Sequence, residues 1–522
     1  MTNKKTIIIG AGLAGLSAGC YGQMNGYDTQ IFEAHHMPGG LCTAWKRKGF
    51  TIPTAGWVNG SGPANNDTHR FWNELGAIQG REFADYPEYA RIEAKNGQTL
   101  ILYTDIDRLE EHMLELAPED SKLIKDFAAG LRVFTRLKIP TDKAPELMGF
   151  VDKVKMMAKF LPVMLGPNGK WLKMSLGDFA NRFKSPLMRE FFSEGVPNVF
   201  FFDTDIALMF VMSTLASMHL KNAGYPMGGC MGFVRAIERR YNDLGGQIHY
   251  RLPVEEILVE NDRAVGVRLA DGTEHRADVV ISAADGRRTI FDMLHGRYLN
   301  DEIKKRYDSM PLFPRLFFIS LGVNRTFEKK PASVGGDVFR LDEPIDIAGK
   351  KVQWLAPHIY DFDASLAPQD KTLIRVMLPA SHEYWAELRK SDRARYNVEK
   401  QEIADAVIAG LDKRYPGLAG QVEMCDVATP VTFERYTGNY KGSPLGWLTT
   451  AKTMQMSVSK ALPGLEGFYL VGTWVLNGSI AYAATSGRHV TQVLCKKDGK
   501  PFVTALPPEA VEMQDTARAA GF

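Results

Sequence analysis

Thr6-Ile7-Ile8-Ile9-Gly10-Ala11-Gly12-Leu13-Ala14-Gly15 stands near the start of the chain, and Ile31-Phe32-Glu33 follows about one βαβ unit later. The first four residues predict a buried strand that runs into a glycine turn and then a helix. In such a turn Gly10 permits the tight bend, Gly12 lets the backbone approach a pyrophosphate, and Gly15 lets the helix pack closely on the strand. Glu33 stands where a carboxylate accepts hydrogen bonds from ribose hydroxyls. The stretch therefore predicts a dinucleotide site, with Ala11 and Ala14 completing its turn.

A second glycine pair, Gly39-Gly40, follows the second predicted strand, with Ala34 before it and Leu41 after it. This pair allows a long, extended cofactor a further close approach to the backbone. Near the other end of the chain, residues 467–473 predict a buried strand that ends in a glycine turn, and residues 478–487 open another helix. Glycine turns at both ends of the chain favour a flavin over a nicotinamide cofactor.

This arrangement resembles the FAD-binding superfamily that includes the amine oxidases and the phytoene desaturase type. The resemblance implies that the N-terminal turn holds the ADP half of FAD. It also implies that a C-terminal helix begins near the flavin ring, at Gly472, Thr473, Ser479, Ile480 and Ala481. We expect the positive end of that helix to stabilise negative charge on reduced flavin.

Intermediate segments are similar to the desaturase branch of this superfamily, which also contains carotenoid isomerases and retinol saturases. Tyr225-Pro226-Met227-Gly228-Gly229 is similar to the YPxGG segment of the branch. Residues 253–272 look like its hairpin, whose valine, here Val254, touches the adenine. Residues 277–285 resemble the returning strand of the nucleotide domain.

Three positions depart from the branch. Residues 49–57 lack the aspartate of its GFxFDxG form, and residues 477–481 replace its GGGxP near the flavin. Leu41 stands where many relatives have an arginine, which removes one phosphate contact. These departures leave the substrate and the direction of the reaction open, whereas they leave the prediction of FAD in place.

Composition fits a large flavoprotein. A chain of 522 residues with 45% hydrophobic residues can bury two cores. Its 63 basic and 61 acidic residues create no field that would gather nucleic acid. The five cysteines are widely spaced, so they predict neither a disulfide framework nor a metal site and fit a reducing compartment. Cys42 is close to the predicted cofactor site, where covalent flavin attachment or redox chemistry is the alternative to an ordinary buried thiol.

We expect a cytoplasmic protein. The first predicted strand begins a few residues after Met1, which leaves no room for a signal peptide. The longest apolar run, residues 196–220, contains Asp203 and Asp205, and its uninterrupted part is too short to cross a bilayer. Peripheral contact with the cytoplasmic face of a membrane is compatible with this pattern.

The predicted fold class is α/β, with a Rossmann-type FAD-binding domain (a parallel sheet with helices) and a discontinuous substrate domain. The FAD-binding domain takes residues 1–85, 221–295 and 451–500, and residues 501–522 form a C-terminal tail. Residues 86–220 are predicted to be a helical substrate or lid region, and residues 296–450 a sheet-rich substrate domain. Strands predicted at residues 315–321, 351–355 and 373–378 are interpreted as one antiparallel platform over the isoalloxazine.

Residues 147–220 hold nine of the 22 methionines and ten phenylalanines. Flexible thioethers and aromatic rings line surfaces that accept long apolar molecules, so one hypothesis makes this region a substrate entrance. The alternative is an ordinary helical core. Lys153, Lys155 and Lys159 alternate with apolar residues, which is consistent either with a helix on an anionic bilayer or with a solvated lysine face.

The expected function is that of an FAD-dependent oxidoreductase acting on a long apolar polyene or isoprenoid, by desaturation, saturation or isomerisation at flavin N5. One alternative is a flavin amine oxidase, in which Trp474 and Tyr482 would form an aromatic cage. Another is a non-enzymatic prenyl-binding escort protein, although such proteins have a degraded nucleotide site. No catalytic side chain is predicted. Without a second GxGxxG motif, the electron partner is oxygen, a quinone, a protein or a nicotinamide that visits the same site.

Overall fold

The computed structural model describes residues 3–62, 67–137, 141–165, 167–200, 203–328, 330–453, 458–476 and 478–510. Its centre is a five-stranded parallel sheet with the strand order β10-β2-β1-β14-β21. These strands are β1 (Lys5–Ile9), β2 (Asp28–Glu33), β10 (Gln247–Tyr250), β14 (Val279–Ser282) and β21 (Phe468–Leu470). The sheet therefore joins stretches from both ends and the middle of the chain, and the α/β fold class is confirmed.

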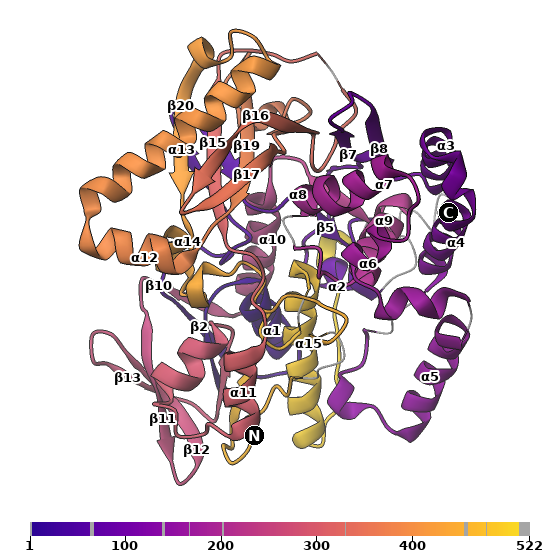
Figure 1. Ribbon diagram of the computed structural model, residues 1–522. Coiled ribbons are helices and arrows are strands. Elements are labelled where there is room, and N and C mark those ends of the chain that lie inside the picture. Colours follow the sequence, from indigo (N-terminus) through magenta and orange to yellow (C-terminus); the bar gives the residue numbers. More distant parts are fainter. Residues whose placement is uncertain are drawn as a thin grey trace.

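Both faces of this sheet are buried, which explains why its strands are nearly continuous apolar runs. Ile8 and Ile31 point to one face, where helices α1 (Leu13–Met24), α10 (Cys230–Asp243) and α15 (Ile480–Lys497) cover them. Ile7, Ile9 and Phe32 point to the other face. A small antiparallel sheet covers that face with η5 (Arg288–Met293) and α11 (Asp301–Ser309) (Figure 1). Its strands are β11 (Val254–Glu260), β12 (Arg263–Leu269) and β13 (Glu274–Arg276).

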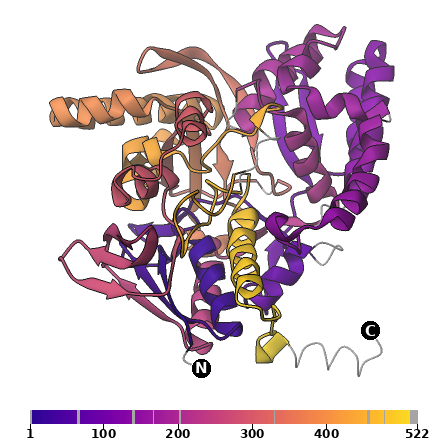
Figure 2. The same cartoon turned by 90° about the horizontal axis from the view of Figure 1, so that it is seen from below.

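Small residues let α1 and α15 pack closely against each other. The Ser17 hydroxyl donates to the Ala484 carbonyl at 2.7 Å. A Cβ atom on Gly487 would lie 2.4 Å from the Ala14 carbonyl oxygen, so a larger residue there would push the two helices apart. Figure 2 shows α15 beside α1 near the centre of the molecule. This contact brings the N-terminal and C-terminal glycine turns to the same end of the central sheet.

The three strands that were interpreted as one antiparallel platform belong to two different sheets. β15 (Leu316–Val323) and β19 (Thr372–Pro379) pair antiparallel in the sheet β18-β19-β15-β20. β17 (Lys350–Leu355) instead belongs to the sheet β17-β16-β7-β8. The remaining strands of these two sheets are β7 (Glu88–Glu93), β8 (Thr99–Tyr103), β16 (Asp337–Ile347), β18 (His358–Ile359) and β20 (Val422–Ala428).

The single platform was therefore a wrong interpretation, because the second sheet is completed by strands from a distant part of the chain. β7 and β8 form a hairpin within residues 86–220, a region expected to be helical, and β7 pairs in parallel with β16. Helices follow the hairpin in this region: α3 (Ile106–Leu116), α4 (Ser121–Arg136), α5 (Phe150–Leu165), α6 (Leu176–Ala180), α7 (Pro186–Glu190), α8 (Val196–Phe200) and α9 (Leu208–His219).

Most of the described methionine and phenylalanine side chains of residues 174–218 form a helical core. Met174, Met188, Met212, Met218, Phe179, Phe183, Phe191 and Phe192 are all buried in one cluster. The hypothesis that this set lines a substrate entrance is therefore wrong for these side chains, whose burial stabilises the fold. Phe201 and Phe202 lie outside the described residues. In the part of the chain that the structure describes, no helix is both long and apolar enough to span a membrane.

Short elements complete the structure. They are α2 (Asp67–Glu74), β3 (Ala44–Arg47), β4 (Phe50–Pro53), β5 (Val58–Asn59), β6 (Phe83–Ala84), β9 (Ala223–Pro226), α12 (His382–Ser391), α13 (Arg393–Arg414) and α14 (Pro430–Thr437).

Candidate active site

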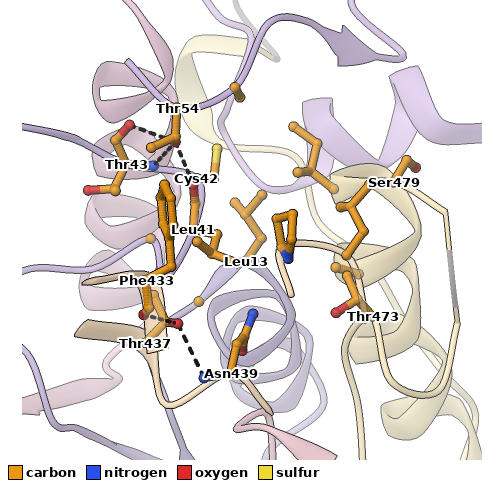
Figure 3. Close-up of a pocket in the computed structure, with 18 of the residues that line it drawn as sticks. Leu13, Leu41, Cys42, Thr43, Thr54, Phe433, Thr437, Asn439, Thr473 and Ser479 are labelled. Carbon is orange, nitrogen blue, oxygen red and sulfur yellow. Dashed lines mark hydrogen bonds between the residues drawn. The ribbon is translucent and has the colours of Figure 1, made fainter. Parts of the chain in front are cut away.

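A cavity of about 2190 Å³ lies where the two glycine turns meet the substrate-side sheets. Ordinary ligand pockets have volumes of roughly 300–1000 Å³, so this cavity has room for a large cofactor and a second molecule. Figure 3 shows Leu41, Cys42 and Thr54 on one side, Thr473 and Ser479 on the other, and Leu13 between them. The cavity is therefore built from both ends of the chain.

The three fingerprint glycines have three different structural reasons. Gly10 has a φ of +97°, a conformation that other residues rarely adopt. A Cβ atom on Gly15 would lie 2.0 Å from the Gly10 carbonyl oxygen, so close packing of α1 excludes any side chain there. Gly12 lines the cavity, and a Cβ atom there would meet nothing within 4 Å among the described residues. The fold therefore requires Gly10 and Gly15, whereas Gly12 keeps space free for a ligand.

Glu33 ends β2 at the wall of this cavity. One carboxylate oxygen accepts the Ala11 N–H at 2.6 Å, and the other accepts the His35 N–H at 2.7 Å. Burial raises the pKa of Glu33, while these backbone N–H groups partly oppose the rise. The carboxylate thus holds the glycine turn and remains next to the cavity.

The second glycine pair is joined to the first turn. The Gly39 N–H donates to the Ala11 carbonyl at 2.8 Å, and a Cβ atom on Gly40 would lie 3.5 Å from the Cα of Gly12. Gly40 has a φ of +59° and lines the cavity together with Ala34 and Leu41. The two turns therefore form one continuous wall.

The C-terminal turn forms the opposite wall. The Gly472 N–H donates to the Ser486 hydroxyl at 2.7 Å, and the Ser479 hydroxyl caps α15 by accepting the Tyr482 N–H at 3.2 Å. A Cβ atom on Gly472 would lie 3.8 Å from the Cβ of Ala14, so this turn touches α1 directly.

The structure brings almost all of the sequence-predicted site residues to this cavity. Those that line it are Gly10, Gly12, Ala14, Glu33, Ala34, Gly40, Leu41, Val254, Gly472, Thr473, Ser479, Ile480 and Ala481. The other two act behind the wall, because the Ala11 N–H is bonded to Glu33 and Gly15 packs under Gly10. Asn477, which was part of the quoted departure from the GGGxP form, lies outside the described residues.

The far part of the cavity is apolar. Its wall combines side chains of the helical region with side chains of the β15 sheet and of the segment that follows β20. The large apolar lining residues are Trp45, Trp57, Tyr89, Phe134, Leu137, Val199, Met209, Phe210, Leu220, Phe313, Leu316, Phe318, Val334, Met377, Phe433 and Leu445. A wall of this composition favours a hydrophobic ligand.

Arg375 is a cavity residue that sequence reasoning missed. Its side chain is 3% exposed on β19, and the guanidinium donates to the carbonyls of Pro53 and Thr54 at 3.1 and 3.3 Å. It also contacts the His358 ring at 3.2 Å. Burial and then the Arg375 charge lower the pKa of His358 well below its usual value, so that imidazole is neutral near pH 7. A charge inside the apolar run 373–378 was the signal in the sequence.

Asp285 is a second residue of this kind. It follows β14, lines the cavity and is 2% exposed. Its carboxylate accepts the Arg288 N–H at 2.7 Å and the Tyr440 N–H at 2.8 Å, which ties the central sheet to the segment after α14. Burial raises the pKa of Asp285 to about 6.

Trp474 and Tyr482 do not form a pair that faces the cavity. Tyr482 lines the cavity, whereas Trp474 packs against Tyr307 and Trp447 with ring centroids 6.3 and 5.1 Å away. The aromatic cage considered for an amine substrate is therefore not assembled by these two residues.

Comparison with known proteins gives a consistent result. The family model described as flavin containing amine oxidoreductase matches residues 13–495. The chain is 24% identical to a chloroplastic prolycopene isomerase of Daucus carota over 488 residues, which is 89% of this chain and 75% of that protein. It is also 24% identical to a neurosporene-forming phytoene desaturase of Rhodobacter capsulatus over 520 residues, which is 94% of each protein.

Solved structures share the fold. An oxidoreductase from Methanosarcina mazei aligns with a TM-score of 0.59 and 19% identity, over 94% of this chain and all of that one. A putrescine oxidase with bound putrescine aligns with a TM-score of 0.60 and 14% identity, over 95% of this chain and 99% of that one.

Proposed function

Because the chain belongs to the family of flavin containing amine oxidoreductases, it is an FAD-dependent oxidoreductase, and we propose that its substrate is a long apolar polyene or isoprenoid of the carotenoid or retinoid kind. The observation that carries this proposal is the large apolar part of the cavity, which continues from the glycine turns to Phe134 and Leu220. Bound FAD supplies a hydride acceptor or donor at N5. The protein then needs to hold the carbon chain and exclude water, and this wall is suited to both tasks.

We propose that the glycine turns hold FAD along the cavity wall. Space at Gly12 and the N-terminus of α1 suit the pyrophosphate, Glu33 suits the adenosine ribose, and Val254 suits the adenine. Residues 472–481 suit the isoalloxazine, with backbone N–H groups of Ile480 and Ala481 at the start of α15. We assign residues 1–85, 221–295 and 451–500 to the FAD-binding domain on this basis.

Two observations favour the polyene over the alternatives. An amine substrate needs groups that hold its cation, and Trp474 is turned away from the cavity toward Tyr307 and Trp447. A non-enzymatic escort protein has no need for a nucleotide site, whereas Gly12 keeps open the space that a pyrophosphate requires. The two relatives reported above are by name a carotenoid isomerase and a carotenoid desaturase.

We also propose that α5 takes the substrate from an anionic membrane surface. Its apolar residues Phe150, Val151, Val154, Met157, Leu161 and Met164 are between 43% and 83% exposed. Figure 1 shows α5 at the periphery of the molecule. Lys159 lines the cavity, so this helix stands at the cavity mouth. The cytoplasmic leaflet carries anionic lipids, which makes that membrane face the proposed location.

The test of the reaction separates its three directions by the redox state of the flavin. Anaerobic mixing of oxidised enzyme with a saturated-bond polyene such as phytoene should bleach the flavin band near roughly 450 nm if the enzyme desaturates. Mixing reduced enzyme with a conjugated polyene should restore the band if the enzyme saturates. Isomerisation should change the geometry of the polyene without net change in the flavin.

A matched pair of variants locates the substrate. Met377→Glu places a charge in the apolar part of the cavity, whereas Val398→Glu makes the same change at an exposed position of α13. The first should lose polyene turnover while keeping FAD, and the second should keep both. Flavin bleaching by amines, with none of the three polyene responses, would overturn the proposal in favour of amine oxidation.

A further inference from the structure

The thiols of Cys42 and Cys230 lie next to each other at the cavity wall, although 187 residues separate them in sequence. The two side chains are 3% and 0% exposed, and both cysteines are unoxidised in this structure. Cys42 lines the cavity, while Cys230 lies behind it. Figure 3 shows Cys42 between Leu41 and Thr54. A pair of buried thiols is thus placed beside the FAD site.

The loops around the pair are held by hydrogen bonds that do not involve the Cys42 thiol. The Cys42 N–H donates to the Gly39 carbonyl at 2.9 Å, and Gly39 is itself bonded to the first glycine turn. Thr43 and Thr54 are joined through the Thr43 N–H and the Thr54 hydroxyl at 3.1 Å. Cys42 is therefore kept against Cys230 by the same contacts that shape the cofactor wall.

Cys230 has the surroundings of a reactive thiol. It is the first residue of α10, a helix of 14 residues, and follows the turn Gly228-Gly229. A helix N-terminus stabilises a thiolate through its N–H groups and its dipole. A hydrogen bond from the Cys42 thiol and backbone N–H groups of Ala55 and Thr54 lower the pKa of Cys230 against the effect of burial. The same contact raises the pKa of Cys42, so one thiolate and one thiol face each other.

We propose that Cys42 and Cys230 are a second redox centre, which cycles between a dithiol and a disulfide and exchanges electrons with the bound FAD. When the Cys42–Cys230 sulfur–sulfur bond forms, one thiol and one thiolate lose two electrons and one proton. FAD takes up those two electrons and that proton, so the step is balanced. The reverse step reduces the disulfide. The proposal rests on FAD binding and is independent of the identity of the substrate.

An anaerobic reductive titration of the holoenzyme tests this proposal. After equilibration in an oxidised glutathione buffer and removal of the buffer, wild type should take up about four electrons per FAD, because a disulfide and a flavin each accept two. Cys42→Ser and Cys230→Ser should each take up about two. Cys425→Ser changes an exposed cysteine and should remain at about four.

Mass spectrometry of the same oxidised samples gives a readout that needs no flavin. After denaturation and alkylation, Cys20, Cys425 and Cys495 should be alkylated, while the peptides of Cys42 and Cys230 should be joined until a reductant is added. This measurement uses wild type, so it remains decisive if a variant fails to fold. Uptake of two electrons by wild type, with all five cysteines alkylated, would overturn the proposal.

Discussion

Gly12 and Gly15 are three positions apart, yet a side chain at each would meet different surroundings. At Gly15 a Cβ atom would lie 2.0 Å from a backbone oxygen, whereas at Gly12 it would enter the cavity and meet nothing within 4 Å among the described residues. We therefore expect Gly12→Val to fold but to purify without flavin colour, because its branched side chain fills the space proposed for the pyrophosphate. Gly15→Val should lose the cooperative thermal transition altogether.

Absorbance at the flavin band and circular dichroism during heating distinguish the two effects. Gly420→Val is the matched control, because a Cβ atom there also meets nothing within 4 Å of the described residues and its φ is not in the left-handed region. That variant should keep both the colour and the transition. A yellow Gly12→Val protein would show that the pyrophosphate lies elsewhere.

Asp285 should make stability depend on pH. Its pKa rises by burial from an ordinary 3.8 to about 6. Between these values the unfolded chain has released the proton that the folded chain keeps, so the free energy of unfolding falls as the pH rises. The expected loss from this one group is about 3 kcal/mol from pH 4 to pH 6 and above.

Unfolding of wild type and Asp285→Asn by urea, at several pH values from 4 to 7, measures this contribution. Other titrating groups cancel in the difference between the two proteins, whereas the Asp285 contribution remains. The stability of wild type relative to Asp285→Asn should fall by about 3 kcal/mol over the interval. A difference that stays constant with pH would show that the carboxyl titrates equally in the folded and unfolded states.

At the scale of the element, α5 has more exposed apolar surface than a helix that packs on a protein core. Among the described residues, no salt bridge engages Lys153, Lys155 or Lys159, and Asp152 is paired with Lys143 at 2.6 Å. Each free lysine near an anionic surface adds about 1 kcal/mol of attraction, which salt screens. We expect wild type to float with anionic liposomes at low salt, and the triple change of these lysines to Glu to remain in the soluble fraction.

The control triple is Lys304, Lys305 and Lys390 changed to Glu, since these lysines are exposed on α11 and α12 and the change in net charge is identical. It should float like wild type. Flotation of the α5 variant with the same efficiency as wild type would show that these lysines do not direct membrane contact. If neither protein floats, α5 covers a soluble partner or the cavity itself.

Elements differ in how well the sequence predicts them. The β1 strand, the glycine turn and α1 could be predicted because their signals are local: an apolar run, three glycines with separate tasks and a terminal carboxylate at Glu33. The β17-β16-β7-β8 sheet could not, because β7 pairs with a strand about 250 residues later and no local pattern specifies that partner. Arg375 and Cys230 were missed for the same reason, since their contacts at Pro53 and Thr43 lie far away in the chain.

At the scale of the whole molecule, the cavity joins segments from opposite ends of the chain. Its wall contains the turn at Gly10 and Gly12, the loop around Gly40 and the turn at Gly472, and β21 completes the sheet that β1 begins. A ligand that contacts all of these segments must stabilise them together. At a free concentration 100 times its Kd, FAD should add about 2.7 kcal/mol to the free energy of unfolding.

Hydrogen exchange of holoenzyme and of protein stripped of FAD tests this coupling. Removal of FAD should lower the Tm and raise exchange together in residues 10–15, 33–43 and 472–481, because each segment loses the same ligand. The hairpin of β16 and β17 should exchange unchanged, since its residues do not line the cavity. If the N-terminal segments alone lose protection, the cofactor does not reach the C-terminal turn. In that case the isoalloxazine must lie away from α15, and the placement of the apolar substrate must be revised with it.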